Sequence, residues 1–507
     1  MRRISTIVLI ACLVICSACQ VGPKYKLPAV PQTPAGFKEL TENDHWKFAK
    51  PNDGELRGNW WEMFNDAKLT ELEGMVSVSN QSLKQAEAQF RQARALVRVN
   101  RADYFPTIST SPGISVNGAG SARGRGTVTG PSGTISAAGS SGINSSFSIP
   151  VGASWEPDIW GRVGLAVQNA VANAQASAAD LENVRLLLQA ELATDYFQLR
   201  GIDMNTDLLT NTLDAYRRAL ELTRNRYNGG VASKSDVVLA QTQYDSTKAQ
   251  LTDLGVARAQ FEHAIALLAG HAPSDITVPR DVIQGTPPPI PVSLPSQLLE
   301  RRPDIASNER RVAAANANIG LARAAFYPSL SISASAGLDS SNISSLFTWP
   351  ARFWSVGPQL AQTLFDFGRR SATVEEFQAN YDSVVAGYRQ TALTAFQEVE
   401  DALVALRVLA QEAEEQASAV RGAEESLALE LDRYKGGTVG YLDVIQTQVI
   451  ALNNERASVD ILQRRMTAAV SLIRALGGGW SQTTLPSPSD LKAKPAKTAR
   501  SIDPGNP

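Results

Sequence analysis

Two long stretches of the chain repeat apolar residues every three or four positions. The recurring residues are Leu186, Leu187, Leu188, Leu192, Tyr196 and Leu199 in the first stretch, and Leu393, Phe396, Val399, Leu403, Leu406 and Leu409 in the second. This spacing is typical of helices that pack side by side. Each stretch can continue for roughly sixty residues without proline, which at 1.5 Å per residue predicts a helix on the order of 95 Å long. A helix of that length does not fit inside a compact domain.

Four shorter stretches alternate apolar and polar residues, which predicts β-strands at about 107–118, 143–157, 329–339 and 352–365. Strands of this length with one apolar face match the staves of a transmembrane β-barrel. A half-buried strand in a soluble sandwich has the same alternation. The neighbouring long helices favour the barrel, because a soluble sandwich does not normally alternate its hairpins with such helices.

The chain contains an internal duplication. The stretch that begins at Tyr227 returns at Tyr434, an offset of 434 − 227 = 207 positions, and the same offset relates Gly161 to Gly368. Because no residue is gained or lost between these landmarks, rigid helices are expected between them. Each half therefore reads as helix, β-hairpin, long helix, tight turn and helix. The two repeats are predicted at 67–270 and 296–477.

The segments between these elements are rich in glycine, proline or serine. Gly229, Gly230, Gly436 and Gly437 are predicted to end the long helices in the left-handed region. Segment 117–142 predicts a loop at the outer mouth, 271–295 a proline-rich linker, and 478–507 a disordered tail. The cluster Phe347, Trp349, Phe353 and Trp354 predicts an aromatic girdle at a bilayer interface. A mobile lid is the alternative for that cluster.

The N-terminus has the pattern of an export signal. A basic start, an apolar run and the small residues Ser17 and Ala18 precede Cys19, which predicts a lipoprotein signal peptide at 1–18 and a covalent lipid, palmitate included, on Cys19. An ordinary signal with incidental cysteines is the alternative. Segment 19–66 is predicted to be extended, ending at Trp60 and Trp61, which either pack on the helices or line a ligand pocket.

Composition excludes several classes of function. The net charge is −2 and the pI is about 6.1, so the chain lacks the basic face that nucleic acid requires. All three cysteines lie in the first nineteen residues, and no disulfide framework is expected. The sequence has no phosphate-binding Gly-Lys-Ser/Thr loop and no His-Glu-x-x-His motif, and its 3 His residues are far apart. We therefore expect neither catalytic residues, nor a metal site, nor a bound cofactor.

The residues that follow the signal carry a family resemblance. Their pattern is Cys-x-Val-Gly-Pro-x-Tyr-x-x-Pro, filled by Cys19, Val21, Gly22, Pro23, Tyr25 and Pro28. The chain resembles the outer-membrane factor family, the TolC-like and NodT-type efflux lipoproteins of tripartite RND systems, through the repeat landmarks to about Gly477. The resemblance implies a homotrimer in the outer membrane of a Gram-negative bacterium, with its helices in the periplasm. It also implies a periplasmic membrane-fusion adaptor and an inner-membrane RND transporter as partners.

Physical reasoning also favours a trimer. A barrel in lipid must close, because an open edge leaves backbone groups unpaired. Four strands cannot close alone, two chains give eight strands with a filled interior, and three chains give twelve strands with a pore. The predicted fold is thus an α+β membrane protein, a trimer whose 12-stranded outer-membrane β-barrel continues into a periplasmic α-helical barrel. We expect this architecture to act as a passive exit duct for drugs or other small molecules.

The repeat turns mark the far end of the helices. By resemblance, Asp443 matches an aspartate of the periplasmic aperture, Tyr434 a tyrosine of the closing network, and Asp236 the partner of Asp443 in the first repeat. Val439 and Gln446 depart from the family pattern, so the closing contacts differ. A helix N-cap after a glycine turn is the plain structural alternative for each aspartate. Three copies of Asp443 around one axis would favour cations.

One motif and two alternative functions stay open. Arg301-Arg302-Pro303-Asp304-Ile305 predicts a new helix with Pro303 at its first position, and no chemistry is assigned to it. The duct could instead serve type I protein secretion, or the chain could be a non-channel surface lipoprotein. A wide polar duct is expected to select its cargo weakly.

Overall fold

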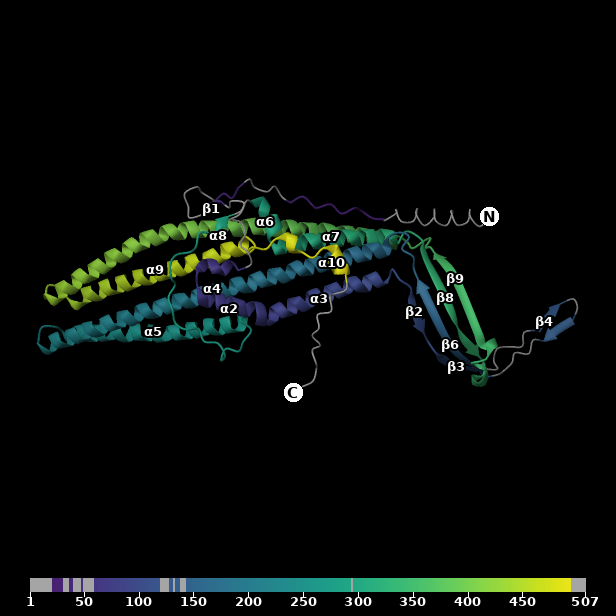
Figure 1. Cartoon of the computed structure of the whole chain (residues 1–507). Coiled ribbons are helices and arrows are strands. Elements are labelled where there is room, and N and C mark those ends of the chain that lie inside the picture. The colour runs from purple at the N-terminus through teal and green to yellow at the C-terminus, as the bar shows by residue number, and fades with distance from the viewer. Residues whose placement is uncertain are drawn as a thin grey trace.

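Long helices form one end of the molecule and an antiparallel sheet forms the other, as Figure 1 shows. The computed structural model describes residues 21–30, 36–39, 47–48, 59–118, 127–130, 133–136, 143–292 and 295–493. Helices α4 (Arg162–Asn228) and α8 (Arg369–Lys435) have 67 residues each, which corresponds to about 100 Å. The prediction of two very long helices is confirmed. None of the described helices is both long and apolar enough to cross a membrane.

The two halves of the chain have the same construction. Helices α3 (Gln81–Ala102) and α7 (Pro303–Ala324) have 22 residues each, and α5 (Lys234–Leu268) and α9 (Tyr441–Ala475) have 35 each. In the hairpins, Thr107 faces Ser154 and Ser329 faces Ala361. These positions differ by 329 − 107 = 222 and 361 − 154 = 207, so the duplication holds residue by residue in the strands as well. The predicted repeat is confirmed.

The sheet joins one hairpin from each half. Its strands are β2 (Thr107–Thr110), β3 (Gly113–Gly118), β6 (Ile143–Trp155), β8 (Ser329–Ser340) and β9 (Arg352–Ala361). The β2 and β3 strands both pair with β6, β6 pairs with β8, and β8 pairs with β9, all antiparallel. Apolar side chains on one face are strongly exposed, among them Ile108, Trp354 and Val356 at 76%, 79% and 65%. Within the described part of the chain, β2 with β3 and β9 are the two edges.

The segment predicted as a plain loop contains a small hairpin, formed by β4 (Thr127–Gly130) and β5 (Gly133–Ser136). A stretch dominated by glycine, serine and threonine has no apolar alternation from which to predict these strands. The other hairpin connection carries η2 (Ile343–Ser345) and η3 (Trp349–Ala351). There Phe347 and Trp349 are each 76% exposed, and the Arg352 guanidinium lies 4.1 Å from the centre of the Trp349 ring. The aromatic girdle stays a prediction.

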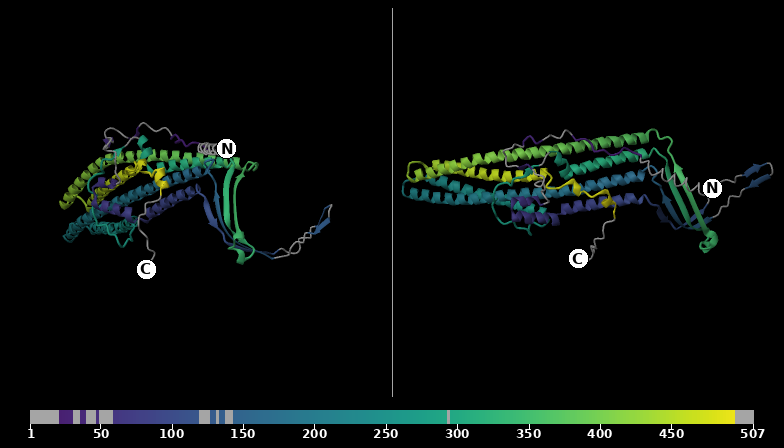
Figure 2. Two further views of the ribbon diagram at one scale, coloured as in Figure 1. Left: turned by 45° about the vertical axis from the view of Figure 1, so that its right-hand side comes forward. Right: turned by 45° about the horizontal axis from the view of Figure 1, so that its top comes forward.

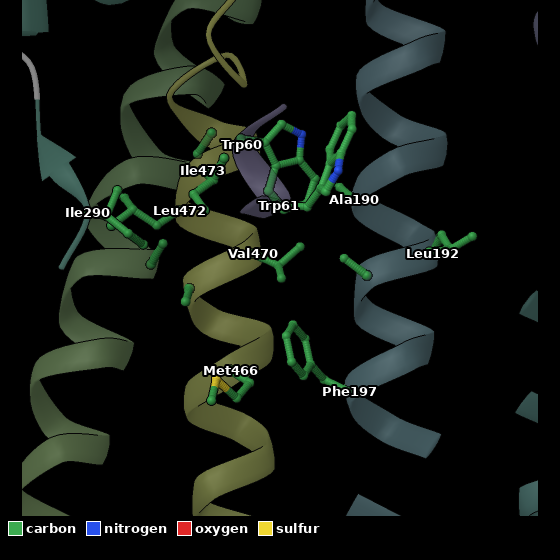
Figure 3. Packing of buried hydrophobic residues seen from close by; sticks show 14 of the residues in the cluster. Trp60, Trp61, Ala190, Leu192, Phe197, Ile290, Met466, Val470, Leu472 and Ile473 are labelled. Carbon is green, nitrogen blue, oxygen red and sulfur yellow. The ribbon is translucent and has the colours of Figure 1, made fainter. Parts of the chain in front are cut away.

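The largest apolar core lies in the middle of the helical part, where Figure 3 shows Trp60 and Trp61 between α4 and α9. Both tryptophans belong to η1 (Trp60–Phe64) and are 2% and 5% exposed, so they pack on the helices. The core also takes residues from α2 (Ala67–Ser79) and from the proline-rich linker, whose Ile290 is buried. The linker is thus docked onto the helices, and leads through β7 (Pro291–Val292), which pairs with β1 (Lys47–Phe48), to α6 (Pro295–Arg301).

The Arg-Arg-Pro-Asp-Ile motif, which contains Arg302, has a structural role. The Arg302 guanidinium donates to the carbonyl oxygen of Ala475 at 3.0 Å, at the end of α9, and pairs with Asp304 and Glu398 at 2.7 and 2.6 Å. In the first half, the Asn80 side chain donates to the carbonyl oxygen of Leu268 at 2.8 Å, at the end of α5. Both residues close the last turn of a returning helix. Pro303 begins α7, as predicted.

Residues 21–30 run along α7 and α8 (Figure 1). The Pro23 carbonyl accepts from Asn316 at 3.0 Å, and the Tyr25 hydroxyl donates to Glu309. Gly22 has a φ of +145°, and a Cβ there would lie 2.9 Å from the Cα of Gly320. The motif Val-Gly-Pro-x-Tyr therefore fits a close contact with the second repeat. Cys19 lies outside the described residues.

The C-terminal tail differs from the prediction of disorder. Residues 478–493 are ordered, with η4 (Gln482–Thr484) and α10 (Pro488–Lys492). Leu491 is 1% exposed and packs with Val97 of α3 and Val167 of α4. One apolar residue in a polar, proline-rich segment is too weak a pattern to predict this docking. Residues 494–507 lie outside the described part of the chain.

Candidate functional site at the repeat turns

The two repeat turns lie together at the end of the molecule opposite the sheet, in all views of Figures 1 and 2. Gly230 and Gly437 have φ values of +75° and +76°, in the left-handed region that glycine tolerates. Gly229 and Gly436, which precede them, cap α4 and α8 with φ values of −79° and −70°, so the prediction of a left-handed backbone is wrong for these two residues. The predicted glycine turns are therefore present in both repeats, and they place the starts of α5 and α9 side by side with the ends of α4 and α8.

Both predicted aspartates cap the helix that follows their turn. The Asp236 carboxylate accepts from the Ser233 backbone N–H at 2.9 Å, and the Ser233 hydroxyl accepts from the Asp236 N–H at 3.1 Å. The Asp443 carboxylate accepts from the Gly440 N–H at 3.2 Å. Asp443 is exposed and Asp236 is half-buried. The plain capping role is thus observed for both residues, and their role at an aperture stays a prediction.

Tyr434 is 3% exposed and belongs to an apolar cluster at the tip. Its ring centre lies 5.3 Å from that of Tyr441, and its hydroxyl donates to the Thr223 hydroxyl at 3.2 Å. Burial, and then the neighbouring Tyr434, raise the pKa of Tyr441. In the part of the chain that the structure describes, no hydrogen bond joins the Tyr434 hydroxyl to Asp236 or Asp443. The structure does not connect the three predicted residues directly.

Arg226 connects the two turns and was missed by the sequence analysis. Its guanidinium donates to the carbonyl oxygens of Tyr434 and Lys435, the latter at 3.3 Å, and its Cζ lies 4.6 Å from the centre of the Tyr434 ring. A guanidinium over an aromatic face is attractive, and more so when partly desolvated. The signal was in the sequence, because an Arg-Tyr pair precedes the glycines in each repeat.

The two positions that depart from the family pattern have different surroundings. Val439 packs against the apolar cluster around Tyr434, whereas Gln446 is exposed on α9. Val439 therefore adds packing but no charged contact at this turn. Elsewhere in the described ranges, no group of His, Cys, Asp and Glu side chains could hold a metal ion.

Known proteins resemble this chain over nearly its whole length. The family described as outer membrane efflux protein matches residues 74–271 and 294–478. The chain is 30% identical over 475 residues to the probable efflux pump outer membrane protein TtgC of Pseudomonas putida, covering 93% of this chain and 94% of that one. It is 32% identical over 482 residues to the outer membrane protein OprJ of Pseudomonas aeruginosa, covering 92% and 94%. The solved outer-membrane channel OprN matches with a TM-score of 0.80 at 27% identity, covering 91% and 100%.

Proposed function

This chain belongs to the outer membrane efflux protein family, and we propose that it works as a passive homotrimeric exit duct. It is an outer-membrane channel component of an efflux pump, with its helices in the periplasm. A periplasmic membrane-fusion adaptor and an inner-membrane RND transporter deliver drugs or other small molecules to the duct. The chain itself performs no catalysis and needs no cofactor beyond a covalent lipid on Cys19.

The observation that carries this proposal is an incomplete sheet on duplicated helices of about 100 Å. Its two edges expose unpaired backbone groups, which is costly in lipid, so the sheet must continue into other copies. Three copies of β2/β3, β6, β8 and β9 give a twelve-stranded barrel wide enough for a pore. The helices then continue the pore through the periplasm toward the adaptor.

Pore formation by purified protein tests the proposal. We expect the full chain to migrate as a trimer in detergent and to produce ionic current in a planar lipid bilayer. A strain that lacks the protein should become more sensitive to antibiotics, and the intact gene should restore resistance. A detergent-indifferent single chain without pore current would contradict the proposal.

The aperture role of Asp443 needs a test that separates charge from capping. Asp443→Asn removes the charge but keeps a side-chain oxygen that can cap the helix. We expect this variant to lose cation selectivity in the bilayer assay, because three carboxylates no longer face the axis. Asp432→Asn is the matched control, since Asp432 is exposed and pairs with Lys435 at 2.9 Å. Equal selectivity in all three proteins would leave Asp443 with the cap alone.

A further inference from the structure

The contact between Arg226 and Tyr434 joins the first repeat to the second, and the duplication supplies its counterpart. The offset of 207 takes Arg226 to Arg433, and takes Tyr434 back to Tyr227. Arg433 and Tyr227 are the same residue types in the same places, yet within one chain they do not repeat the contact. The Arg433 side chain is 60% exposed and pairs with Glu430 at 3.0 Å, and Tyr227 is 41% exposed.

A second pair of positions, farther along the helices, is also in contact in one arrangement and exposed at the equivalent positions of the other repeat. Gly201 of α4 packs against Gln463 of α9 so closely that a Cβ on Gly201 would lie 2.1 Å from the Gln463 Oε1. The offset takes these positions to Val408 on α8 and Val256 on α5. Both valines are exposed, at 46% and 59%. The interface within the chain has a tight contact between Gly201 and Gln463. At the equivalent positions, the two faces without a partner in the chain carry exposed valines, whose apolar side chains would cover each other.

The sheet edges agree with this equivalence. Between the two hairpins, Ala153 of β6 faces Ala334 of β8. The offset of 207 from β6 to β9 and the offset of 222 from β8 back to β2 and β3 carry this pair to positions 360 and 112. The same antiparallel register would place Val356 opposite Val116 across two copies. These two valines are 65% and 61% exposed, and each lies on the apolar alternation of its strand. In that register the apolar face would continue from one copy to the next, whereas a shift of one residue would turn it to the opposite face.

We propose that Arg433 docks onto the partner subunit's Tyr227 at the tip, as Arg226 docks onto Tyr434 within the chain. This inference rests on the trimer of the proposed function. The tip then holds a ring of alternating arginine–tyrosine contacts, one within each chain and one between each chain and the next. Sequence duplication explains why one chain carries both halves of the second contact without using them itself.

The contact between copies is more polar than the one within the chain. Within the chain, the Tyr434 hydroxyl meets Thr223 and its ring meets Tyr441. At the equivalent positions stand Glu430 and Lys234, and Lys234 already lies 5.7 Å from the ring centre of Tyr227 in the same chain. Glu430 therefore meets the hydroxyl of the partner subunit's Tyr227 and balances the two cations there. Because salt screens exposed charges, the contact between copies should weaken more at high ionic strength than the contact within the chain.

Cross-linking between differently tagged chains tests the proposal. One chain carries Tyr227→Cys, the other Arg433→Cys, and both are co-expressed as full chains in the outer membrane. We expect a short bifunctional maleimide to yield a dimer with both tags on a denaturing gel. The matched control places Arg226→Cys and Tyr434→Cys on separate chains. It should yield no such dimer, because those positions meet within a chain. The parent chain, whose cysteines all lie in the first nineteen residues, should also yield none.

A second pair separates this inference from the trimer on which it rests. Val116→Cys and Val356→Cys on separate chains should form a two-tag dimer wherever the barrel closes. If that dimer forms and the tip dimer does not, the proposed contact is wrong and the trimer stands. If neither forms, the proposed trimer itself fails. If the control pair at the tip cross-links as well as the proposed pair, the equivalence of the two interfaces is refuted.

Discussion

Gly270 and Gly477 each follow a returning helix, α5 or α9, and pack against the backbone where two other helices meet. Alanine at either position should destabilise the fold. Gly270 follows α5 with a φ of +79°, and a Cβ there would lie 2.4 Å from the carbonyl oxygen of Ser79. Gly477 follows α9 with a φ of +92°, and its Cβ would lie 2.1 Å from the carbonyl oxygen of Arg301. Both obstacles are backbone atoms, so neither can move aside as the end of a flexible side chain would.

The magnitude has two parts. Alanine in the left-handed region costs about 1–2 kcal/mol relative to glycine. Forcing a methyl group into a packed site costs about 1–3 kcal/mol more. Gly270→Ala and Gly477→Ala should therefore each lower the free energy of unfolding by about 2–5 kcal/mol. Gly285→Ala is the matched control, because Gly285 has a φ of +83° with nothing within 4 Å of its Cβ, so only the first cost applies.

Urea unfolding of the detergent-solubilised protein, followed by helical circular dichroism, measures these differences. Subtracting the Gly285→Ala effect from the Gly270→Ala effect isolates the contact with Ser79. The reasoning is refuted if the control costs as much as Gly270→Ala, since the carbonyl contact would then contribute nothing. A Gly477→Ala effect far from that of Gly270→Ala would contradict the equivalence of the two joints.

Three further substitutions test separate features. Glu73 is 0% exposed, neither carboxylate oxygen has a hydrogen-bond partner in the described structure, and burial raises its pKa well above the usual value. Because the folded state holds a proton on Glu73 that the unfolded state releases, stability should fall as the pH rises above about 4.3. Glu73→Gln should make that fall shallower in urea midpoints measured across pH. Arg302→Ala leaves Glu398 unpaired beside an uncapped α9 and should cost about 3 kcal/mol, with Arg302→Lys intermediate, in the same unfolding assay. Arg226→Ala should speed hydrogen exchange at both repeat turns, whereas Arg224→Ala should not, since Arg224 bonds only within the first repeat, to Gln241.

The helices and their equality could be predicted because their signals are local. Apolar spacing of three and four recurs in part of each 67-residue helix, and glycine pairs mark where the helices stop. The break before α3 and the start of α7 at Pro303 follow from single residues that cap or open a helix. Asn80 and Arg302 differ in type, however, and no local pattern shows that both close a returning helix.

The docked segments escaped prediction for a related reason. Leu491 lies in a polar tail, and Ile290 lies in a proline-rich linker, so neither belongs to a periodic apolar face. Each is buried because a gap between helices happens to accept it. The depth of Glu73 is equally invisible in sequence, because an acidic residue on a helix is normally solvated.

The apolar periodicity, the duplication and the turn residues can be read from the amino-acid sequence, and with them the order and length of the main elements. Periodicity and turn residues depend on neighbours within a few positions, and the duplication is visible when one half of the chain is compared with the other. Which side chains meet across the two repeats, as Arg226 meets Tyr434, depends on how the helices pack in three dimensions. Two residues about two hundred positions apart meet because helices pack in one register and not another, and that choice is a property of the whole core.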